Sequence, residues 1–425
     1  MGRRLWMGVA VLSTALAGCR AVGPGIMPDL PAPSAPKPPP ELTAIPTGSL
    51  EPDLKSLPKV DPRTTELAVI APVPSGYLGL TAEACRLEAA SRTTLSVLLV
   101  SENDVPLSTE STPTSQTAGS LIGQVRVLVA EEARNRAAAH ALEQFYQLAD
   151  AEGRAELVRS SLPVLDQLRT TVRKARVDGL RVPLEPGELD RQRGSLIALI
   201  GQADLAARLL DLDLKRRLGV SGKSGERLHP VGPFPVTAEP VNTDAAIQVA
   251  LERRADLRML RAVYLGLTPE TLPTARDVIR HAAEAGGLIG PGGVIPTPPV
   301  RTLVAKFATR NTPDGPDPAV VAEIMVRRQQ LFDLITEHER QVADQVRAAA
   351  ITQDAQTQQV GLARWRAEQL LAKAVDGKGQ GPLVELPAIL EAYRARAEVI
   401  AAVMTWQQAR VKLLAAQGLL AEPAK

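Results

Sequence analysis

The feature that most constrains this chain is the length of its unbroken helical patterns. From Ser120 to about Arg181, apolar residues recur at three-to-four spacing, and Gly153 and Pro163 interrupt them. About 60 residues at 1.5 Å each would reach ~90 Å, which is far longer than a helix of a globular domain. A helix of that length needs lateral support from other helices. We expect Pro163 to kink or divide it.

Each long pattern is followed by a turn and a shorter returning helix. After the first long helix, the chain turns within 177–187. It returns as a helix from Glu188 to Leu218, in which leucine or alanine recurs at every seventh residue. The second runs from Ala319 to about Ala374, turns within 376–383 and returns from Leu386 to Gln417. Aromatic residues make up only 3% of the chain, which favours narrow helical seams over a compact globular core. The sequence therefore predicts a mainly α fold of two long antiparallel helical hairpins, with little or no β structure.

The two hairpins repeat one another in sequence. Placing Gly219 over Gly418, each just after a returning helix, sets an offset of 199 residues. Pro183-Leu184 then falls on Pro382-Leu383, and Asp178-Gly179 falls one residue away from Asp376-Gly377. A period this long indicates duplication of a domain-sized unit rather than a solenoid repeat. Two similar hairpins in one chain would suit quasi-equivalent places in a symmetric ring.

Shorter elements and linkers divide the rest of the chain. Helices are predicted from Thr81 to Val100, from Thr243 to about Leu267 and from Ala275 to Ala285. The segment from Ser101 to Gly119 is rich in Ser, Thr and Pro and is predicted to be a loop. The predicted domains are an export signal (1–18), a proline-rich tether (19–80), a first hairpin repeat (81–221), a linker (222–242) and a second hairpin repeat (243–425).

The N-terminal residues have the order of an export signal. Arg3 and Arg4 precede an apolar stretch from Leu5 to Ala17, which is too short to span a bilayer. The run Leu16-Ala17-Gly18-Cys19 resembles the lipobox of bacterial lipoproteins, in which the cysteine is acylated, and this implies a lipid anchor at Cys19. The alternative is an ordinary secretory signal with a chance cysteine. Fourteen of the 35 prolines lie between Pro24 and Pro74, so we expect a semi-rigid tether after the anchor.

Three features together resemble the outer-membrane efflux proteins typified by TolC. They are the duplicated hairpin, the two glycine-containing tips, and the run Arg254-Ala255-Asp256-Leu257, which is similar to the family's Arg-Pro-Asp-Leu helix start. The tip residues that carry the resemblance are Gly179, Leu184, Gly377 and Leu383. The resemblance covers roughly Thr81 to Leu419. It implies a lipid-anchored homotrimer in the cell outer membrane, whose hairpins form a tunnel through the periplasm and meet a periplasmic adaptor protein linked to an inner-membrane pump.

The sequence departs from the family where strands are expected. Family members place a β-hairpin after the first helix of each half, and these strands form a barrel in the outer membrane. A membrane strand needs about 9–11 residues of alternating polarity with aromatic residues at the interfaces. This pattern is absent from segment 101–119 and from segment 286–318. Segment 286–318 contains one candidate strand, Val300–Ala308. We therefore expect reduced or missing barrel strands, which favours the alternative of a lipid-anchored periplasmic coiled-coil scaffold or adaptor without channel activity.

Composition and motifs argue against nucleic-acid binding and catalysis. The 49 Lys and Arg residues against 47 Asp and Glu give a net charge of +2, without the basic face of a nucleic-acid binder. After the signal, no run of 18 apolar residues predicts a transmembrane helix. The four histidines lack metal-ligand spacing, and the glycines of 286–293 are not followed by Gly-Lys-Ser/Thr. Cys85 is expected to be a small buried side chain. We predict a protein that is not an enzyme and has no cofactor or metal.

Charged residues mark both predicted tips, and two interpretations of them stay open. One is contact with a partner or an ionic gate at a tunnel mouth. The other is a solvated turn whose Asp-Gly pairs tolerate left-handed backbone. The predicted partner-binding residues are Asp178, Gly179, Arg181, Leu184, Asp376, Gly377, Lys378 and Leu383. The predicted function is the channel component of a tripartite efflux or type I secretion system, acting as a passive conduit.

Overall fold

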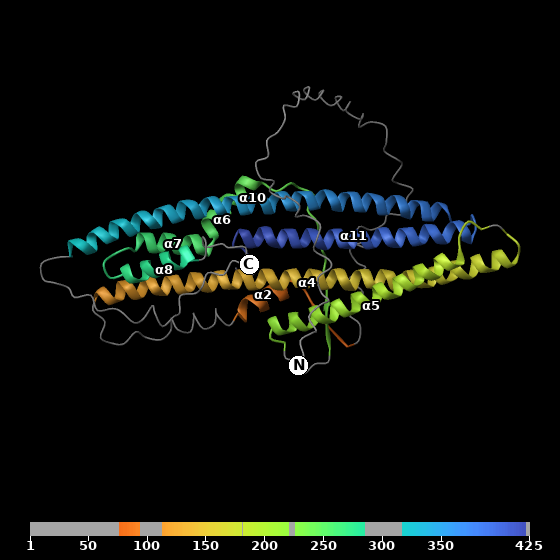
Figure 1. Ribbon diagram of the computed structural model, residues 1–425, viewed down its shortest axis with the longest axis horizontal. Helices are drawn as coiled ribbons and strands as arrows, with labels where there is room; N and C mark the ends of the chain where they lie inside the picture. Colours follow the sequence, from red (N-terminus) through yellow and green to blue (C-terminus); the bar gives the residue numbers. More distant parts are fainter. Residues whose placement is uncertain (1–75, 94–112, 181, 221–225, 285–316, 422–425) are drawn as a thin grey trace, which may run out of the picture. The chain divides into compact units, whose positions relative to one another are not determined.

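The computed structural model describes residues 76–93, 113–180, 182–220, 226–284 and 317–421 (Figure 1). These residues form two long helical hairpins, several shorter helices and one pair of short strands. The predicted export signal, the predicted acylation site Cys19, most of the proline-rich tether, Arg181 and the candidate strand Val300–Ala308 lie outside the described residues.

The first hairpin consists of α4 (Pro113–Val177) and α5 (Pro186–Arg217), and the second of α10 (Pro318–Asp376) and α11 (Pro382–Ala416). With 65 and 59 residues, α4 and α10 are about 100 Å and 90 Å long at 1.5 Å per residue. α11 packs along both α10 and α4, and α5 packs along α4 (Figure 1). The predicted fold class, mainly α with two long antiparallel hairpins and little β structure, is confirmed in the described residues.

Helix α4 is longer and more continuous than predicted. It starts at Pro113, so the predicted loop is wrong for residues 113–119. Proline suits the first turn of a helix because its missing N–H would have no partner there. The helix also runs through Pro163 without dividing. A proline inside a helix costs about 3 kcal/mol. Packing of the following turn, at Leu165 and Leu168, against leucines of α5 and α11 offsets that cost.

The duplication is visible in the hydrogen bonds that end the returning helices. After α5, the N–H of Val220 donates to the carbonyl of Lys215 at 3.0 Å. After α11, and 199 residues later, the N–H of Leu419 donates to the carbonyl of Leu414, also at 3.0 Å. The residue before each donor is a glycine with left-handed backbone, Gly219 with φ 59° and Gly418 with φ 76°. Both ends have the Schellman arrangement, so the sequence offset superposes them.

The repeats also begin alike. Helix α2 (Ala82–Ser91) is capped by Thr81, and α6 (Thr243–Arg253) is capped by Asn242. Each helix is followed by an arginine that lies against the glycine ending its own repeat. The Arg92 Nη1 donates to the Gly219 carbonyl at 3.0 Å, and the Arg254 backbone lies beside Gly418. Helix α2 ends earlier than the predicted Val100.

The predicted single helix from Thr243 to Leu267 is divided. α6 ends at Arg253 and α7 spans Ala255–Leu265, because Arg254 between them is extended, with φ −60° and ψ 125°. A further helix, α8 (Leu272–Glu284), follows. The periodicity of apolar residues continues through the break, so the sequence pattern alone did not reveal it.

Two short strands were not predicted. β1 (Tyr77–Leu80) pairs in parallel with β2 (Arg227–Pro230), with Tyr77 opposite Arg227. Each strand has four residues, too few for a clear alternation of polar and apolar positions. β2 is tied to the helices, since the N–H of Leu228 donates to Asp211 Oδ1 at 2.8 Å on α5. The strands therefore join the start of the first repeat to the segment that follows its returning helix.

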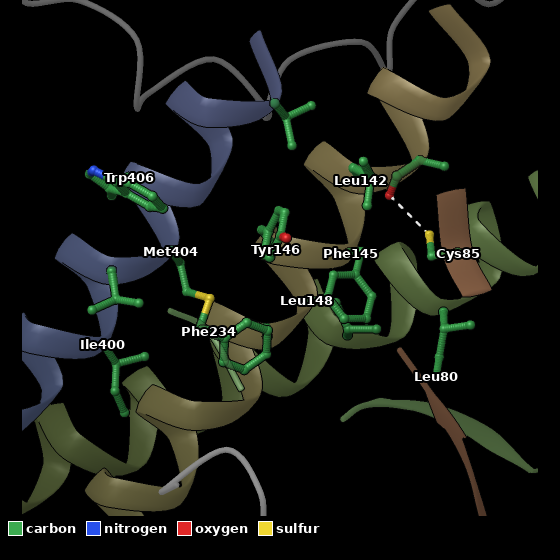
Figure 2. Packing of buried hydrophobic residues seen from close by; sticks show 14 of the residues in the cluster. Leu80, Cys85, Leu142, Phe145, Tyr146, Leu148, Phe234, Ile400, Met404 and Trp406 are labelled. Atoms are coloured by element: carbon green, nitrogen blue, oxygen red, sulfur yellow. Dashed lines mark hydrogen bonds between the residues drawn. The ribbon is translucent and has the colours of Figure 1, made fainter. Parts of the chain in front are cut away.

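A core of buried side chains forms where α2, α4 and α11 meet the segment after β2 (Figure 2). The rings of Phe145 and Tyr146 lie 5.2 Å apart, and Phe234 packs against both. The Cys85 Sγ donates to the carbonyl of Ala141 at 3.5 Å, and burial raises the pKa of this thiol to about 12. The prediction that Cys85 is a small buried side chain is confirmed.

Candidate functional site

The first hairpin turns at a left-handed glycine. Gly179 has φ 78°, its N–H donates to the carbonyl of Arg176 at 3.0 Å, and the N–H of Leu180 donates to the carbonyl of Ala175 at 2.9 Å. A side chain with a Cβ is strained in this backbone region, which accounts for glycine here. The Asp-Gly pair at this tip therefore provides the left-handed turn that its sequence permits.

The second hairpin turns differently. Gly377 has φ −72°, and its N–H donates to the carbonyl of Lys373 at 3.0 Å, which ends α10. The left-handed glycines at this tip are Gly379 and Gly381, with φ 84° and 104°. α11 starts at Pro382, whereas the aligned Pro183 precedes the start of α5. The second returning helix is therefore about one turn longer at the tip than the first.

The structure brings the two tips together. Leu184 from the first tip and Leu383 from the second pack against the same cluster of buried side chains, which includes Leu165 and Leu189. A hollow of about 310 Å³ lies between the tips. Its lining residues include Lys174, Asp178 and Leu180 from the first hairpin and Gln380, Gly381 and Leu383 from the second. The predicted tip residues thus form one surface rather than two separate ones.

The predicted site residues differ in exposure. Asp178, Gly179, Asp376 and Lys378 are exposed, Leu184 and Leu383 are half-buried, and Gly377 is buried. Arg181 lies outside the described residues. The hollow between the tips was not predicted, because residues about 200 positions apart form it and no local pattern signals that proximity.

Ion pairs brace the first tip. Asp190 on α5 accepts hydrogen bonds from Arg169 at 2.6 Å and from Arg173 at 3.0 Å, both on α4. In the opposite direction, Arg193 on α5 donates to Asp166 on α4 at 2.8 Å. The bonds from Arg169 hold the pKa of Asp190 below its usual value, and those from Arg193 do the same for Asp166. These carboxylates stay charged at neutral pH and align α5 with α4.

A second group of polar side chains lies buried far from the tips, around the run Arg254-Ala255-Asp256-Leu257. The Asp256 carboxylate accepts from Arg254 Nε at 3.0 Å and Nη2 at 2.6 Å, from His338 Nε2 at 2.9 Å and from the N–H of Leu257 at 2.9 Å. Arg254 Nη1 also donates to Gln345 Oε1 at 2.9 Å. The sequence singled out this run only as a resemblance, and its role as a buried polar junction between α7 and α10 was not predicted.

The histidines of the described segments have different surroundings. His338 is packed against Asp256 and His229 against Glu152, whereas His140 is exposed. In the part of the chain that the structure describes, no group of three or more histidine, cysteine, aspartate or glutamate side chains could hold a metal ion. Among the same residues, no helix combines the length and the apolar character needed to cross a membrane.

No protein-family model and no curated protein matches this sequence. Several solved structures do match its fold. The MtrE outer membrane channel of Neisseria gonorrhoeae is 13% identical, with 79% of this chain and 88% of that chain covered and a TM-score of 0.48. The CmeC outer membrane channel of Campylobacter jejuni is 10% identical, with 85% and 86% covered and a TM-score of 0.47. The outer membrane protein VceC of Vibrio cholerae is 13% identical, with 72% and 75% covered and a TM-score of 0.47.

These proteins are TolC-family outer membrane channels. Their match to this chain is a likeness of fold, at low sequence identity and with TM-scores below 0.5.

Proposed function

We propose that this protein is the outer-membrane channel component of a tripartite efflux or type I secretion system. It would act as a homotrimer whose hairpins surround a helical tunnel. Conduction would be passive, and the energy would come from an inner-membrane pump reached through a periplasmic adaptor. A lipid anchor at Cys19 would hold the chain in the outer membrane, with the helical body in the periplasm.

The observation that carries this proposal is a pair of matching apolar stripes on α5 and α10. On α5 the exposed Ile197, Leu205, Leu209 and Leu212 share one helical face. On α10 the exposed Ile351, Leu362 and Trp365 also share one face of their helix. Leu209 and Trp365 are 60% and 61% exposed, which is costly for side chains of this size unless something covers them.

The two stripes lie at the same level relative to the tips. Ile197 and Leu212 follow Pro186, the first residue of α5, by 11 and 26 residues, which is about 16 Å and 39 Å. Trp365 and Ile351 precede Asp376, the last residue of α10, by 11 and 25 residues, which is about 16 Å and 38 Å. If α5 of one copy lies antiparallel to α10 of the next with the tips level, the stripes cover one another.

Such a contact would be head-to-tail. Within the described residues, α5 packs along α4, and α10 packs along α11, so each stripe lies on a helix at the end of the row α10, α11, α4, α5. A contact between different surfaces of identical copies closes into a ring when the rotation permits it. The hollow between the tips would then be repeated around the mouth of the ring, where an adaptor could contact it.

A matched pair of substitutions tests the assembly and the tip separately. Leu209→Glu places a charge in the stripe, and Leu180→Glu places one at the tip; both leucines are 60% exposed. Burying a leucine contributes about 2 kcal/mol, so Leu209→Glu should weaken each contact about thirtyfold or more. We expect detergent-extracted wild type and Leu180→Glu to be trimers with ionic conductance in planar bilayers, and Leu209→Glu to be monomeric.

The same pair distinguishes the channel from its alternative. Leu180→Glu should retain conductance but lose export in cells, because the tip contacts the adaptor. A wild-type protein that is monomeric and does not conduct would refute the channel and favour the lipid-anchored periplasmic scaffold. Retention of the protein in membrane fractions after Cys19→Ser would refute the proposed anchor.

A further inference from the structure

A cavity of about 360 Å³ divides the buried core along α4. Leu157 belongs to the same buried cluster as Phe145, whereas Leu165 belongs to the cluster at the tips. These two leucines are eight residues apart, which is about 12 Å along the helix. The cavity lies between them and is lined by α4, α5 and α11. Its volume is within the range of sites that bind small molecules, about 300–1,000 Å³.

The inner walls of the cavity are apolar. Leu157 and Leu165 are 6% and 1% exposed and form its floor on α4. The space lies on the α11 side, where Ala397 and Ala401 have only a methyl group each. Further apolar walls come from all three helices and consist of Val158, Leu196 and Leu390. A hydrocarbon chain placed here would be removed from water on several sides, which is favourable in proportion to the apolar area that it buries.

The cavity opens to solvent beside Leu199 on α5, which is 48% exposed. Leu199 follows Ile197 by two residues, and residues with that spacing lie on different sides of a helix. Ile197 belongs to the stripe that we assign to the contact with the next copy, so that contact leaves Leu199 and the mouth of the cavity uncovered. A ligand can therefore enter whether the protein is a monomer or a ring.

One positive charge at the mouth has no partner. Arg394 on α11 lines the cavity and is exposed, and its side chain makes no ion pair or hydrogen bond with any described residue. The other charged residues that line the cavity are balanced. Arg154 donates to Asp150 on the same helix. Glu398 accepts from Arg366 Nη1 at 2.9 Å. The uncompensated charge beside the apolar walls is therefore positive.

We propose that this cavity binds an amphipathic anion of the alkyl carboxylate type. The hydrocarbon chain lies between α4 and α11, and the anionic group pairs with Arg394, because a guanidinium can form two parallel hydrogen bonds with a carboxylate. A helix of a partner protein is too large for the space. One turn of helix about 10 Å wide and 5.4 Å long occupies about 420 Å³, more than the whole cavity. A free fatty acid and the acyl chain of an anionic lipid share the required chemistry. All lining residues come from one copy, so the site does not depend on the proposed channel.

Photolabelling of the full-length protein in a nonionic detergent tests this proposal. The probe is a dodecanoate that carries a diazirine near the end of its chain, and mass spectrometry identifies the labelled peptides. We expect labels on α4 between 157 and 165 and on α11 between 390 and 401. Unlabelled dodecanoate should compete with the probe. Dodecyltrimethylammonium, which has the same chain and the opposite charge, should compete at least ~10-fold less, because Arg394 repels a cation.

Substitutions separate the charge from the space. Arg394→Gln should weaken the competition by dodecanoate about tenfold, because it removes a charged hydrogen-bond donor. The matched control is Arg396→Gln, on the same helix but outside the cavity lining, which should leave the competition unchanged. Ala397→Leu combined with Ala401→Leu should fill the space and abolish labelling. If circular dichroism shows that this variant does not fold, Leu199→Glu provides the same test at an exposed position, where an added anion should repel the probe.

Each outcome decides for or against the proposal. Labels outside the cavity, equal competition by the two amphiphiles, or equal competition in Arg394→Gln and Arg396→Gln would overturn it. Labelling of Leu209→Glu as a monomer without labelling of the wild-type trimer would also overturn it, because a neighbouring copy would then fill the cavity. Stronger competition by phosphatidylglycerol than by dodecanoate would support an anionic lipid as the source of the ligand, and the reverse order would support a free fatty acid.

Discussion

Asp256→Asn removes the negative charge from the buried junction between α7 and α10 and keeps the shape of the side chain. Asp256 is the counter-charge of Arg254, a residue that is only 6% exposed. The asparagine amide would also turn its NH₂ group toward N–H donors of Arg254 or His338. The variant therefore tests whether this ion pair stabilises the base of the second hairpin.

The expected loss follows from burial. Removing one partner of a buried ion pair leaves an uncompensated charge and costs about 3–5 kcal/mol. An exposed ion pair on α10, the helix that contributes His338 to the junction, provides the scale for comparison. Asp344 is 76% exposed and accepts from Arg347 Nη1 at 2.8 Å. Asp344→Asn should cost no more than about 0.5 kcal/mol, because solvent screens the charges.

Urea denaturation followed by circular dichroism measures both losses. The double variant Arg254→Met with Asp256→Leu should recover part of the stability, because it leaves no unpaired charge, although His338 and Gln345 each lose a partner. A loss for Asp256→Asn that equals the loss for Asp344→Asn would refute the reasoning. So would a double variant as unstable as the single one, because the penalty would then not come from an unpaired charge.

Two further predictions concern the glycines that end the repeats and the buried thiol. Gly418→Ala should cost about 2–4 kcal/mol in the same assay, because its Cβ would lie 3.2 Å from the Arg254 Cα in left-handed backbone. Gly219→Ala should cost about 1–2 kcal/mol, because the atom that it meets belongs to the flexible Arg92 side chain; the reverse order would contradict this. Cys85 should react with iodoacetamide at least ~100-fold more slowly in the native protein than in urea, and equal rates would show that the thiol is accessible.

The elements that the sequence predicted well depend on neighbours close along the chain. Apolar residues at three-to-four spacing predict the long helices. Glycine tolerates left-handed backbone, so Gly219 and Gly418 predict where the returning helices end. The sequence alone predicted the 199-residue offset between the two repeats, because the same local arrangement occurs twice along the chain. The loop prediction failed at 113–119, where Pro113 starts a helix instead of preventing one.

The features that were missed depend on residues far apart in the sequence. Tyr77 and Arg227 pair across 150 positions, and four-residue strands carry little pattern of their own. The break at Arg254 interrupts a continuous helical pattern, because the arginine and Asp256 pair inside a core to which α10 contributes His338. At the tips, the sequence identified the turn residues but not the hollow that Asp178 and Gln380 share.

For this protein, the sequence by itself determined the helices, their approximate lengths and the doubling of the hairpin, because helix formation and helix ends depend on contacts within a few residues. The tertiary structure alone decided which polar side chains are buried, since Glu132, Asp256 and His338 look like surface residues until three helices enclose them. It also decided that the two tips meet. These relations join distant parts of the chain, and no local preference encodes them.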